Sequence, residues 1–429
     1  MQDHDPIVVT GMGAVSPLGV GVAANWRRLV AGESGIVRNT RFDVSDFACK
    51  IAGLVPSRAD DPEGFAAEDF LDPREMRKSD LFIHYAVAAT QEAIAEARWA
   101  PADAAGCART AVVIATGVGG IAAMTDAVGT LATRGPRRLS PFVVPSFLPN
   151  LAAGHISIRH GFTGPIGCPV TACAASAQAI GDGMRLIASG EADVAVCGGA
   201  DACVGPVSIG GFGAARALST AFNDRPAEAS RPFDTAHDGF VLSEGAATLV
   251  IERLSHALRR GAEPLAVVAG YGTAADAYHI TAGRPDGAGG AAAMTAALAM
   301  AGIGPDAVDY VNAHSTSTPV GDAAEVAALR TVFPQRGSDL PVTSTKASTG
   351  HLLGAAGALE AIYSVLALRN GVVPAGRNIA DPEPDAATFD LVREGPLTRA
   401  LGVVVSNGFG FGGVNASLAF AQARPAAWA

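Results

Sequence analysis

The sequence predicts an α/β fold made of two similar halves, residues 1–255 and 256–429. Short apolar runs that are typical of strands alternate with helical patterns, at the spacing of β-α-β units in a largely parallel sheet. After Leu254 the alternation begins again, and segment 313–318 takes the place in the second half that segment 115–120 has in the first. Only 6% of the residues are aromatic whereas 49% are hydrophobic, so small aliphatic side chains must build the core.

The first half begins with an apolar strand at residues 7–10, which Gly11 and Gly13 close as a turn. Apolar runs predict further strands at 111–117, 166–171, 192–199 and 245–252. Helical patterns cover 22–31, 79–97 and 173–189. Proline and polar residues predict irregular structure at 38–75 and 133–150 and a polar insertion at 213–240.

The second half repeats this organisation with a closing pair of strands. A strand and loop are predicted at 264–276, a helix at 289–303, and another strand and loop at 308–318. Segment 343–368 indicates a strand that runs into a Gly/Ala-rich helix. Two final strands are predicted at 403–413 and 414–421.

Composition and motifs exclude several functional classes. The formal net charge of −10 argues against a nucleic-acid partner or an anionic membrane. We find no run of 18 apolar residues and no signal-peptide pattern at the N-terminus, so we expect a cytoplasmic protein without a membrane span. The six cysteines show no metal-binding spacing and there is no HExxH motif, so we predict no metal.

Segment 11–16, GMGAVS, approximates the dinucleotide-binding pattern G-x-G-x-x-G after a strand. However, Ser16 replaces the third glycine, and Pro17 interrupts the start of the expected helix. A tight turn is the simpler interpretation, and a nicotinamide-dependent oxidoreductase is a distant alternative.

Three segments contain residues that could carry chemistry. Cys173 falls where a strand ends and a helix begins, and the positive end of the helix dipole favours its thiolate, although a buried inert cysteine is the alternative. His314 follows a strand and begins a run of hydroxyl residues, and a purely structural histidine is its alternative. Lys346 and His351 lie five residues apart in a Gly/Ala-rich segment, where Glu360 could neutralise the lysine. One cysteine and two histidines suggest acyl chemistry on a thiol.

Five motifs extend this interpretation by resemblance. The segments TACAAS, DAYHIT, YVNAHSTSTPVGDAAE, STKASTGHLLGAAGALE and SNGFGFGGVNASL resemble, in order and spacing, those of β-ketoacyl-acyl carrier protein synthases, most closely synthase II. The resemblance covers nearly the whole chain. It implies the thiolase fold, in which two α/β halves form a five-layered αβαβα body, and a homodimer.

The resemblance also implies roles for individual residues. Cys173 matches the nucleophile that accepts the acyl chain, and His314 and His351 match the histidines that assist decarboxylation of malonyl groups. Lys346 matches a lysine that organises the site through His351 and Glu360. The backbone N–H groups of Cys173 and Phe411 would form the oxyanion hole, and Phe411 matches an aromatic gate.

Further matched residues surround this group. Asp276 and Glu325 match residues that support the gating loops, and Thr316 and Thr318 match hydroxyls that bind the phosphopantetheine arm. Val118 and Val143 match positions that line the acyl pocket. The residues that match carrier-protein docking positions are Arg74, Arg77, Lys78 and Arg216. Three features depart from the family pattern. Ala174, Ala175 and Ser176 follow the nucleophile, where Thr-Ser-Gly is more usual. Ser315 replaces a usual glycine and would add a hydroxyl beside the pantetheine path, and the small Val118 and Val143 would admit longer acyl chains.

The implied reaction is a decarboxylative condensation of a Cys173-bound acyl chain with malonyl-acyl carrier protein, which lengthens the chain by two carbons. The implied partner is acyl carrier protein, which carries the substrates on phosphopantetheine, and no tightly bound cofactor is expected. The alternative is a ketosynthase of a polyketide or polyene pathway that pairs with a chain-length factor. The chain is not itself such a factor, because those lack the nucleophilic cysteine.

Overall fold

The computed structural model describes residues 5–423. It contains two sets of five strands with the same spatial order, β1-β8-β7-β5-β6 and β9-β15-β14-β10-β11. The two sets are joined where β1 pairs with β9 at Val8–Val267 and Val9–Ala266. The first set is β1 (Ile7–Ser16), β5 (Thr110–Ala115), β6 (Ile166–Gly167), β7 (Val194–Asp201) and β8 (Gly245–Arg253). The second is β9 (Ala266–Ala275), β10 (Tyr310–Asn312), β11 (Val342–Thr343), β14 (Val403–Gly410) and β15 (Val414–Ala421).

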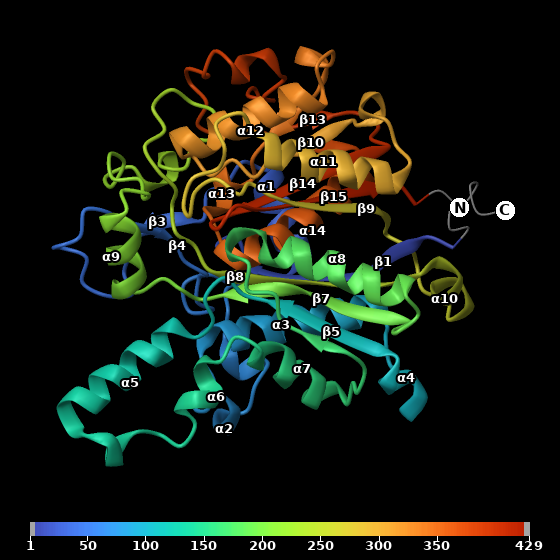
Figure 1. Cartoon of the computed structure of the whole chain (residues 1–429). Helices are drawn as coiled ribbons and strands as arrows, with labels where there is room; N and C mark the ends of the chain where they lie inside the picture. Colours follow the sequence, from blue (N-terminus) through green and yellow to red (C-terminus); the bar gives the residue numbers. More distant parts are fainter. Residues whose placement is uncertain (1–4, 424–429) are drawn as a thin grey trace.

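Helices cover both sets of strands and fill the space between them (Figure 1). The first set has α3 (Leu81–Ala97) and α7 (Leu151–His160) on its outer face, and the second has α11 (Ala288–Ala301) and α12 (Pro319–Val332). Between them, α8 (Ala175–Ala188) and α14 (Ala356–Asn370) contact strands of both sets. The result is the five-layered αβαβα arrangement of the thiolase fold, so the predicted fold class is confirmed.

Small residues allow the two central helices to come close. A Cβ added at Gly357 of α14 would lie 2.8 Å from the backbone nitrogen of Ala177 in α8, so only glycine fits there. Ser176 of α8 also accepts a hydrogen bond from the N–H of Ala358 (2.8 Å), near the start of α14. This contact fixes the starts of both central helices, which adjoin the candidate site.

Three expectations about the strands are wrong. The sheet is mixed rather than largely parallel, because β8 and β15 return antiparallel beside β1 and β9. Gly11 and Gly13 make no turn but lie inside β1, where a Cβ at Gly11 would be 2.1 Å from the carbonyl oxygen of Ala93 in α3. This close packing leaves no phosphate-binding loop, which removes the dinucleotide interpretation. The strand predicted at 166–171 is only the two-residue β6.

The sequence patterns also missed helices on the surface. These are α5 (Ile121–Arg134), α9 (Pro206–Ala214), α12 and the short α6 (Val143–Phe147), the last inside a segment predicted to be irregular. Three glycines in α9 and a proline in α6 hide their helical character. The remaining elements are β2 (Gly19–Val20), α1 (Val22–Val30), β3 (Ile36–Arg38), β4 (Ile51–Gly53), α2 (Pro73–Met76), α4 (Ala104–Ala108), α10 (Leu254–Arg259), α13 (Lys346–Thr349), β12 (Val372–Val373) and β13 (Leu397–Thr398). Within residues 5–423, no helix is long and apolar enough to cross a bilayer.

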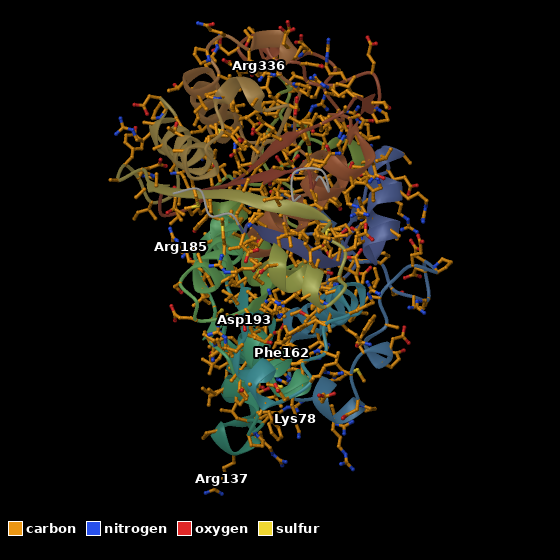
Figure 2. The ribbon with its side chains drawn as sticks, turned by 90° about the vertical axis from the view of Figure 1, so that its right-hand side faces the viewer. Lys78, Arg137, Phe162, Arg185, Asp193 and Arg336 are labelled. Atoms are coloured by element: carbon orange, nitrogen blue, oxygen red, sulfur yellow. The ribbon has the colours of Figure 1, made fainter. Side chains whose placement is uncertain are left out.

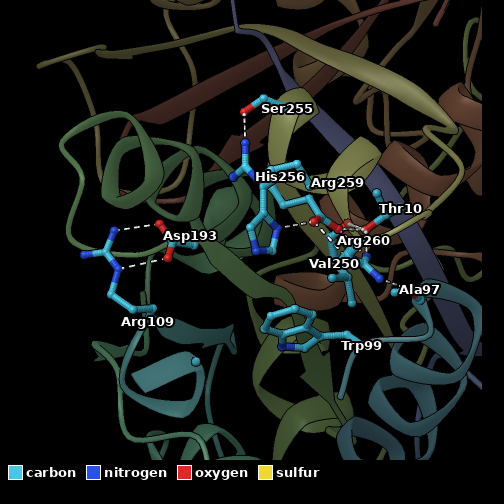
Figure 3. A network of polar contacts seen from close by, with 12 residues as sticks. Thr10, Ala97, Trp99, Arg109, Asp193, Val250, Ser255, His256, Arg259 and Arg260 are labelled. Atoms are coloured by element: carbon cyan, nitrogen blue, oxygen red, sulfur yellow. Dashed lines mark hydrogen bonds and ion pairs between the residues drawn. The ribbon is translucent and has the colours of Figure 1, made fainter. Parts of the chain in front are cut away.

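A buried polar network anchors the end of β8, close to the start of the second half of the chain (Figure 3). The fully buried Glu252 accepts hydrogen bonds from Thr10 Oγ1 (2.6 Å) and from His256, and it forms an ion pair with Arg260. The Arg260 guanidinium lies 5.3 Å from the centre of the Trp99 ring. The network therefore ties α10 to β1 and to the end of α3.

Candidate active site

Cys173 lies at the turn that leads into α8. It is the middle residue of a single 3₁₀ turn, η3 (Ala172–Ala174), and Ala172 before it has a φ of 49°. Gly410 at the end of β14 approaches closely, because a Cβ there would lie 3.2 Å from the Cys173 nitrogen. The backbone N–H groups of Phe411 and of Cys173 itself act on the sulfur. Both N–H groups thus favour negative charge on the atom where an acyl group would attach.

The thiol of Cys173 is held in its protonated form. Burial raises its pKa to about 12, although the positive charge of Lys346 and the N–H of Phe411 act in the opposite direction. The predicted stabilisation of the thiolate by the helix end is therefore outweighed. A base must receive the proton when this sulfur attacks.

Two histidines from the second half face this sulfur. His314 follows β10, and His351 follows α13. One ring nitrogen of each and the Cys173 Sγ all lie within 4.8 Å of one another. The two imidazoles are nearly perpendicular, with ring centres 5.4 Å apart. The structure therefore brings together the three residues that the sequence placed in separate segments.

Both imidazoles are neutral in this environment. Burial lowers the pKa of His314 and of His351 well below the usual value, and the nearby charge of Lys346 adds to the effect. Among the described residues, His314 Nδ1 and both ring nitrogens of His351 have no hydrogen-bond partner. A neutral imidazole carries one N–H donor and one acceptor, so each ring can offer a hydrogen bond to a bound substrate.

Lys346 and Glu360 form the buried ion pair that the sequence predicted. Their side chains are 1% and 3% exposed, and the Lys346 Nζ contacts Glu360 Oε1. Burial raises the pKa of Glu360 to about 7, while Lys346 acts to lower it. The lysine charge is thus neutralised locally but still acts on Cys173 and both histidines.

Glu325 of α12 fixes the backbone of the first histidine. It accepts hydrogen bonds from the N–H of His314 (2.9 Å), the N–H of Ser315 (2.6 Å) and Asn407 Nδ2 (3.0 Å). The Ser315 hydroxyl also donates to it (2.8 Å) and is buried. Ser315 therefore points away from the predicted pantetheine path and strengthens the support of His314 instead.

A cavity of about 530 Å³ opens at this group. Besides the cysteine and the two histidines, the predicted residues that line it are Val118, Arg216, Asp276, Thr316, Thr318, Glu325 and Phe411. The Thr316 and Thr318 hydroxyls are 3.1 Å apart, and the Asp276 carboxylate accepts from Asn415 Nδ2 (2.9 Å) next to the Gly413 turn. Phe411 is 39% exposed, and its ring lies 6.4 Å from that of Phe212.

Other predicted residues lie elsewhere. Val143 is on α6 and does not line the cavity. Arg74, Arg77 and Lys78 are exposed at α2, away from Arg216 at the cavity mouth. The Lys78 ammonium lies 4.7 Å from the centre of the Phe142 ring, and Figure 2 shows Lys78 and Arg137 at the same end of the molecule. Arg137, which the sequence analysis did not select, thus lies at the same end of the molecule as Lys78 (Figure 2).

Sequence reasoning also missed three residues that contact or hold the reacting groups. The rings of Phe409 and Phe240 pack on His314 (5.7 Å between ring centres) and His351 (5.5 Å). The buried carboxylate of Asp201 accepts from the N–H groups of Gly117 (2.8 Å) and Gly354 (2.6 Å), in two segments that pack against each other. Asp201 could have been noticed in the sequence only as a polar residue at the end of an otherwise apolar strand.

The donor set could also be considered as a metal site. One thiol and two imidazoles are ligand types that Zn²⁺ accepts. Two observations favour acyl chemistry: the N–H groups of Phe411 and Cys173 favour negative charge on the sulfur, and an apolar-walled cavity adjoins it. The arrangement can form a thioester on Cys173, stabilise its oxyanion and donate hydrogen bonds from neutral imidazoles to a second substrate.

Comparisons with known proteins agree with this chemistry. Residues 4–257 match the family described as "Beta-ketoacyl synthase, N-terminal domain", and residues 265–380 match "Beta-ketoacyl synthase, C-terminal domain". The chain is 46% identical to a 3-oxoacyl-[acyl-carrier-protein] synthase 2 of Rhizobium meliloti (strain 1021), over 96% of this chain and 97% of that protein.

Two solved structures share the fold along the chain. An ishigamide ketosynthase/chain length factor superposes with a TM-score of 0.89 at 31% identity, covering 98% of this chain and 100% of that one. A type II polyketide ketosynthase in complex with its acyl-carrier protein, bound to the hexaketide, gives a TM-score of 0.88 at 29% identity with the same coverage.

Proposed function

We propose that this chain, which belongs to the β-ketoacyl synthase family, condenses an acyl chain held on Cys173 with a malonyl group carried by acyl carrier protein. The observation that carries the proposal is the meeting of the Cys173 sulfur with His314 and His351 within 4.8 Å. The product is a 3-oxoacyl-carrier protein that is two carbons longer. The name of the Rhizobium relative describes the same activity.

The reaction proceeds in two parts. The Cys173 sulfur attacks the acyl thioester of the first carrier protein while one of the two facing imidazoles takes its proton. A new thioester forms, the bond to the carrier sulfur breaks, and the imidazole returns the proton to that sulfur as it leaves as a thiol. The malonyl thioester then loses carbon dioxide, and its enolate oxygen accepts hydrogen bonds from His314 and His351. The enolate carbon attacks the Cys173 thioester, whose oxyanion meets the N–H groups of Cys173 and Phe411, and the Cys173 sulfur leaves. Neutral imidazoles suit this role, because the step needs enolate stabilisation rather than a strong base.

An intact-mass condensation assay tests the proposal. The purified protein is given malonyl-carrier protein and a ladder of acyl-carrier proteins from short to long chains. We expect acylation of Cys173 followed by a carrier-bound product that is two carbons longer, with both lost in Cys173→Ala. Cys168→Ala is the matched control, because Cys168 is also a half-buried free thiol but lies outside the cavity. Unchanged condensation by Cys173→Ala would contradict the assignment.

The same ladder addresses chain length and pathway. Val118 is small and lines the cavity, so we expect good turnover of long chains. The second candidate function, a ketosynthase of a polyketide or polyene pathway, is favoured by the likeness to the ishigamide ketosynthase/chain length factor. That function predicts acylation of Cys173 without elongation of ordinary saturated chains until a partner subunit is added.

We propose that the carrier protein docks on two basic surfaces. One is the α2 end with Arg74, Arg77 and Lys78, and the other is Arg216 at the cavity mouth. Carrier proteins are acidic, so these charges would steer them although the enzyme is itself acidic.

Charge reversal at Arg77 and Arg216 tests this docking. We expect a higher KM for carrier-bound substrates in Arg77→Glu and Arg216→Glu, with less change in kcat. Arg185→Glu is the control, because Arg185 is exposed and lies away from Lys78 and Arg137 (Figure 2). A KM that responds equally to all three substitutions would argue against specific docking.

Assembly and compartment complete the proposal. Exposed apolar side chains on α5 and α6, among them Val128, Leu131 and Val144, suit a homodimer interface, and a chain-length factor could occupy the same surface. Val143 on α6 would then approach the acyl cavity of the partner subunit rather than that of its own chain.

All six cysteines are free thiols, which suits the reducing cytoplasm. We assign the nucleophile to residues 1–255 and the histidines and lysine to 256–429, with no tightly bound cofactor.

A further inference from the structure

His237 is a buried titratable group that the condensation mechanism does not use. It lies in the polar insertion between α9 and β8 and is 8% exposed. Its Nδ1 is 3.0 Å from Asp322 Oδ2 of α12, and its Nε2 is 3.5 Å from Glu383 Oε1. A neutral imidazole has a single N–H and cannot donate to two carboxylates. Two carboxylates that face the two ring nitrogens therefore favour the imidazolium form.

Asp322 also binds backbone N–H groups next to the cavity wall. Its Oδ1 accepts from the N–H of Ser317 (3.2 Å), and its Oδ2 accepts from the N–H of Phe233 (3.1 Å). Ser317 has a φ of 75°, an unfavourable conformation for a serine, so these contacts must hold it in place. Thr316 and Thr318, on either side of Ser317, place their hydroxyls in the cavity.

The chain that follows His237 leads to the second catalytic histidine. The N–H of Gly239 donates to the Ser317 carbonyl (3.0 Å), and the carbonyl of Val241 accepts from the N–H of His351 (2.8 Å). Phe240 between them packs its ring on the His351 imidazole. One anchored residue thus supports both the threonine hydroxyls and His351.

We propose that His237, as an imidazolium between Asp322 and Glu383, is a positioning residue that makes binding of the carrier-linked substrate sensitive to pH. While His237 is charged, it holds Asp322 and thereby Ser317 and the two threonine hydroxyls. When His237 loses its proton, one carboxylate loses its donor and the Ser317 turn loosens. This inference rests on the proposed function, because it concerns how that cavity receives its substrate.

The charged groups around His237 set the direction of the pH effect. Burial alone would lower the pKa of His237, but Asp322, Glu383 and Asp234 outweigh it and raise the pKa above 6.5. Arg231 of the same segment is paired with Asp234 (2.8 Å). A raised pKa means that the stabilising contact is complete below pH 6.5 and is lost as pH rises through the higher folded-state value.

The test compares KM for malonyl-carrier protein across pH in wild type, His237→Arg and His237→Gln. In wild type, KM should rise as the pH is raised above 6.5. Arginine keeps its charge at these pH values, so His237→Arg should abolish this rise in KM. The same carrier protein is used with every variant, so its own titration contributes equally to all the profiles. Glutamine has no charge, so His237→Gln should show a high KM at every pH, by on the order of tenfold, with less change in kcat.

Glu383→Gln provides a second variant, because Glu383 is half-exposed and lies outside the cavity. Removing its charge should move the rise in KM to lower pH, which decides the question even if His237→Arg fails to fold. A wild-type KM profile in His237→Gln, or an alkaline rise in His237→Arg equal to that of wild type, would overturn the inference. Absence of condensation in wild type would instead contradict the proposed function.

Discussion

A single buried carboxylate, that of Asp201, ties together two adjoining backbone segments next to the cavity. Besides the N–H groups of Gly117 and Gly354, it accepts a hydrogen bond from Thr116 Oγ1 (2.6 Å). Gly117 leads to Val118 in the acyl cavity, and Gly354 follows the turn after His351. The charge of Asp201 also raises the pKa of Cys173, second to burial itself among the effects that raise it. Asp201 therefore has a positional effect and an electrostatic effect, which can be separated.

Asp201→Asn should lower the condensation activity but raise the reactivity of the Cys173 thiol. An amide group would face a backbone N–H, so the turns should shift and kcat/KM should fall by on the order of tenfold. Loss of the negative charge should lower the thiol pKa, so alkylation of Cys173 by iodoacetamide should be faster at a given pH. Asp182→Asn on the surface of α8 is the control. Equal alkylation rates with normal condensation would contradict both roles.

The residues of the site differ in how visible they were in the sequence. Cys173, His314, Lys346 and His351 stood out because reactive residue types sat in short segments of small or hydroxyl residues. Asp201 accepts from N–H groups 84 and 153 positions away, and Phe240 packs on a histidine that is likewise distant in sequence, so no local pattern could mark them. Ser315 was recognised as unusual, but its direction depends on Glu325 in a helix that the sequence did not predict.

Among the helices and strands, burial decided which could be predicted. The strands β5, β7, β8, β14 and β15 and the helix α3 are almost entirely covered and show as apolar runs. By contrast, α5 has no buried residue, and α9 carries three glycines, so neither gives a clear pattern. The parallel sheet was predicted from alternation alone, which does not fix strand direction. In the structure, β8 and β15 each pair with the first strand of their half and run antiparallel to it.

The Ser176 contact shows how one element can complete another. No side chain of its own segment caps α14, and the Ser176 hydroxyl from α8 accepts the N–H of Ala358 instead. An unpaired N–H at a buried helix start would be costly. A sequence-based search for capping residues just before α14 could not find this contact, because the cap is 182 positions away.

The molecule as a whole draws its reacting groups from both sets of strands. The nucleophile comes with α8 of the first half, and the two histidines come with β10 and α13 of the second. The relative placement of the halves therefore sets the distance between sulfur and imidazoles. Near residue 255 the Glu252 network holds the connection between them, so its stability bears on the whole fold (Figure 3).

The Glu252 network predicts a specific loss of stability in acid. Burial alone would raise the pKa of Glu252, but hydrogen bonds from Arg260, His256 and Thr10 prevail and lower it from 4.5 to about 2. A lowered pKa contributes stability that is complete above pH 4.5 and is lost as the pH falls toward 2. The difference corresponds to about 3 kcal/mol at neutral pH. Glu252→Gln should remove about this amount, because it leaves the Arg260 charge unpaired.

Urea unfolding between pH 7 and pH 3 measures this effect. The difference in unfolding free energy between wild type and Glu252→Gln should stay constant down to about pH 4.5 and narrow below it. Glu263→Gln is the matched control, because Glu263 forms an ion pair with Arg369 while 70% exposed, and it should change stability little. A difference in unfolding free energy that narrows already between pH 7 and pH 5 would contradict the assignment to Glu252. Equal stability of the two variants would show that the network does not hold the halves together.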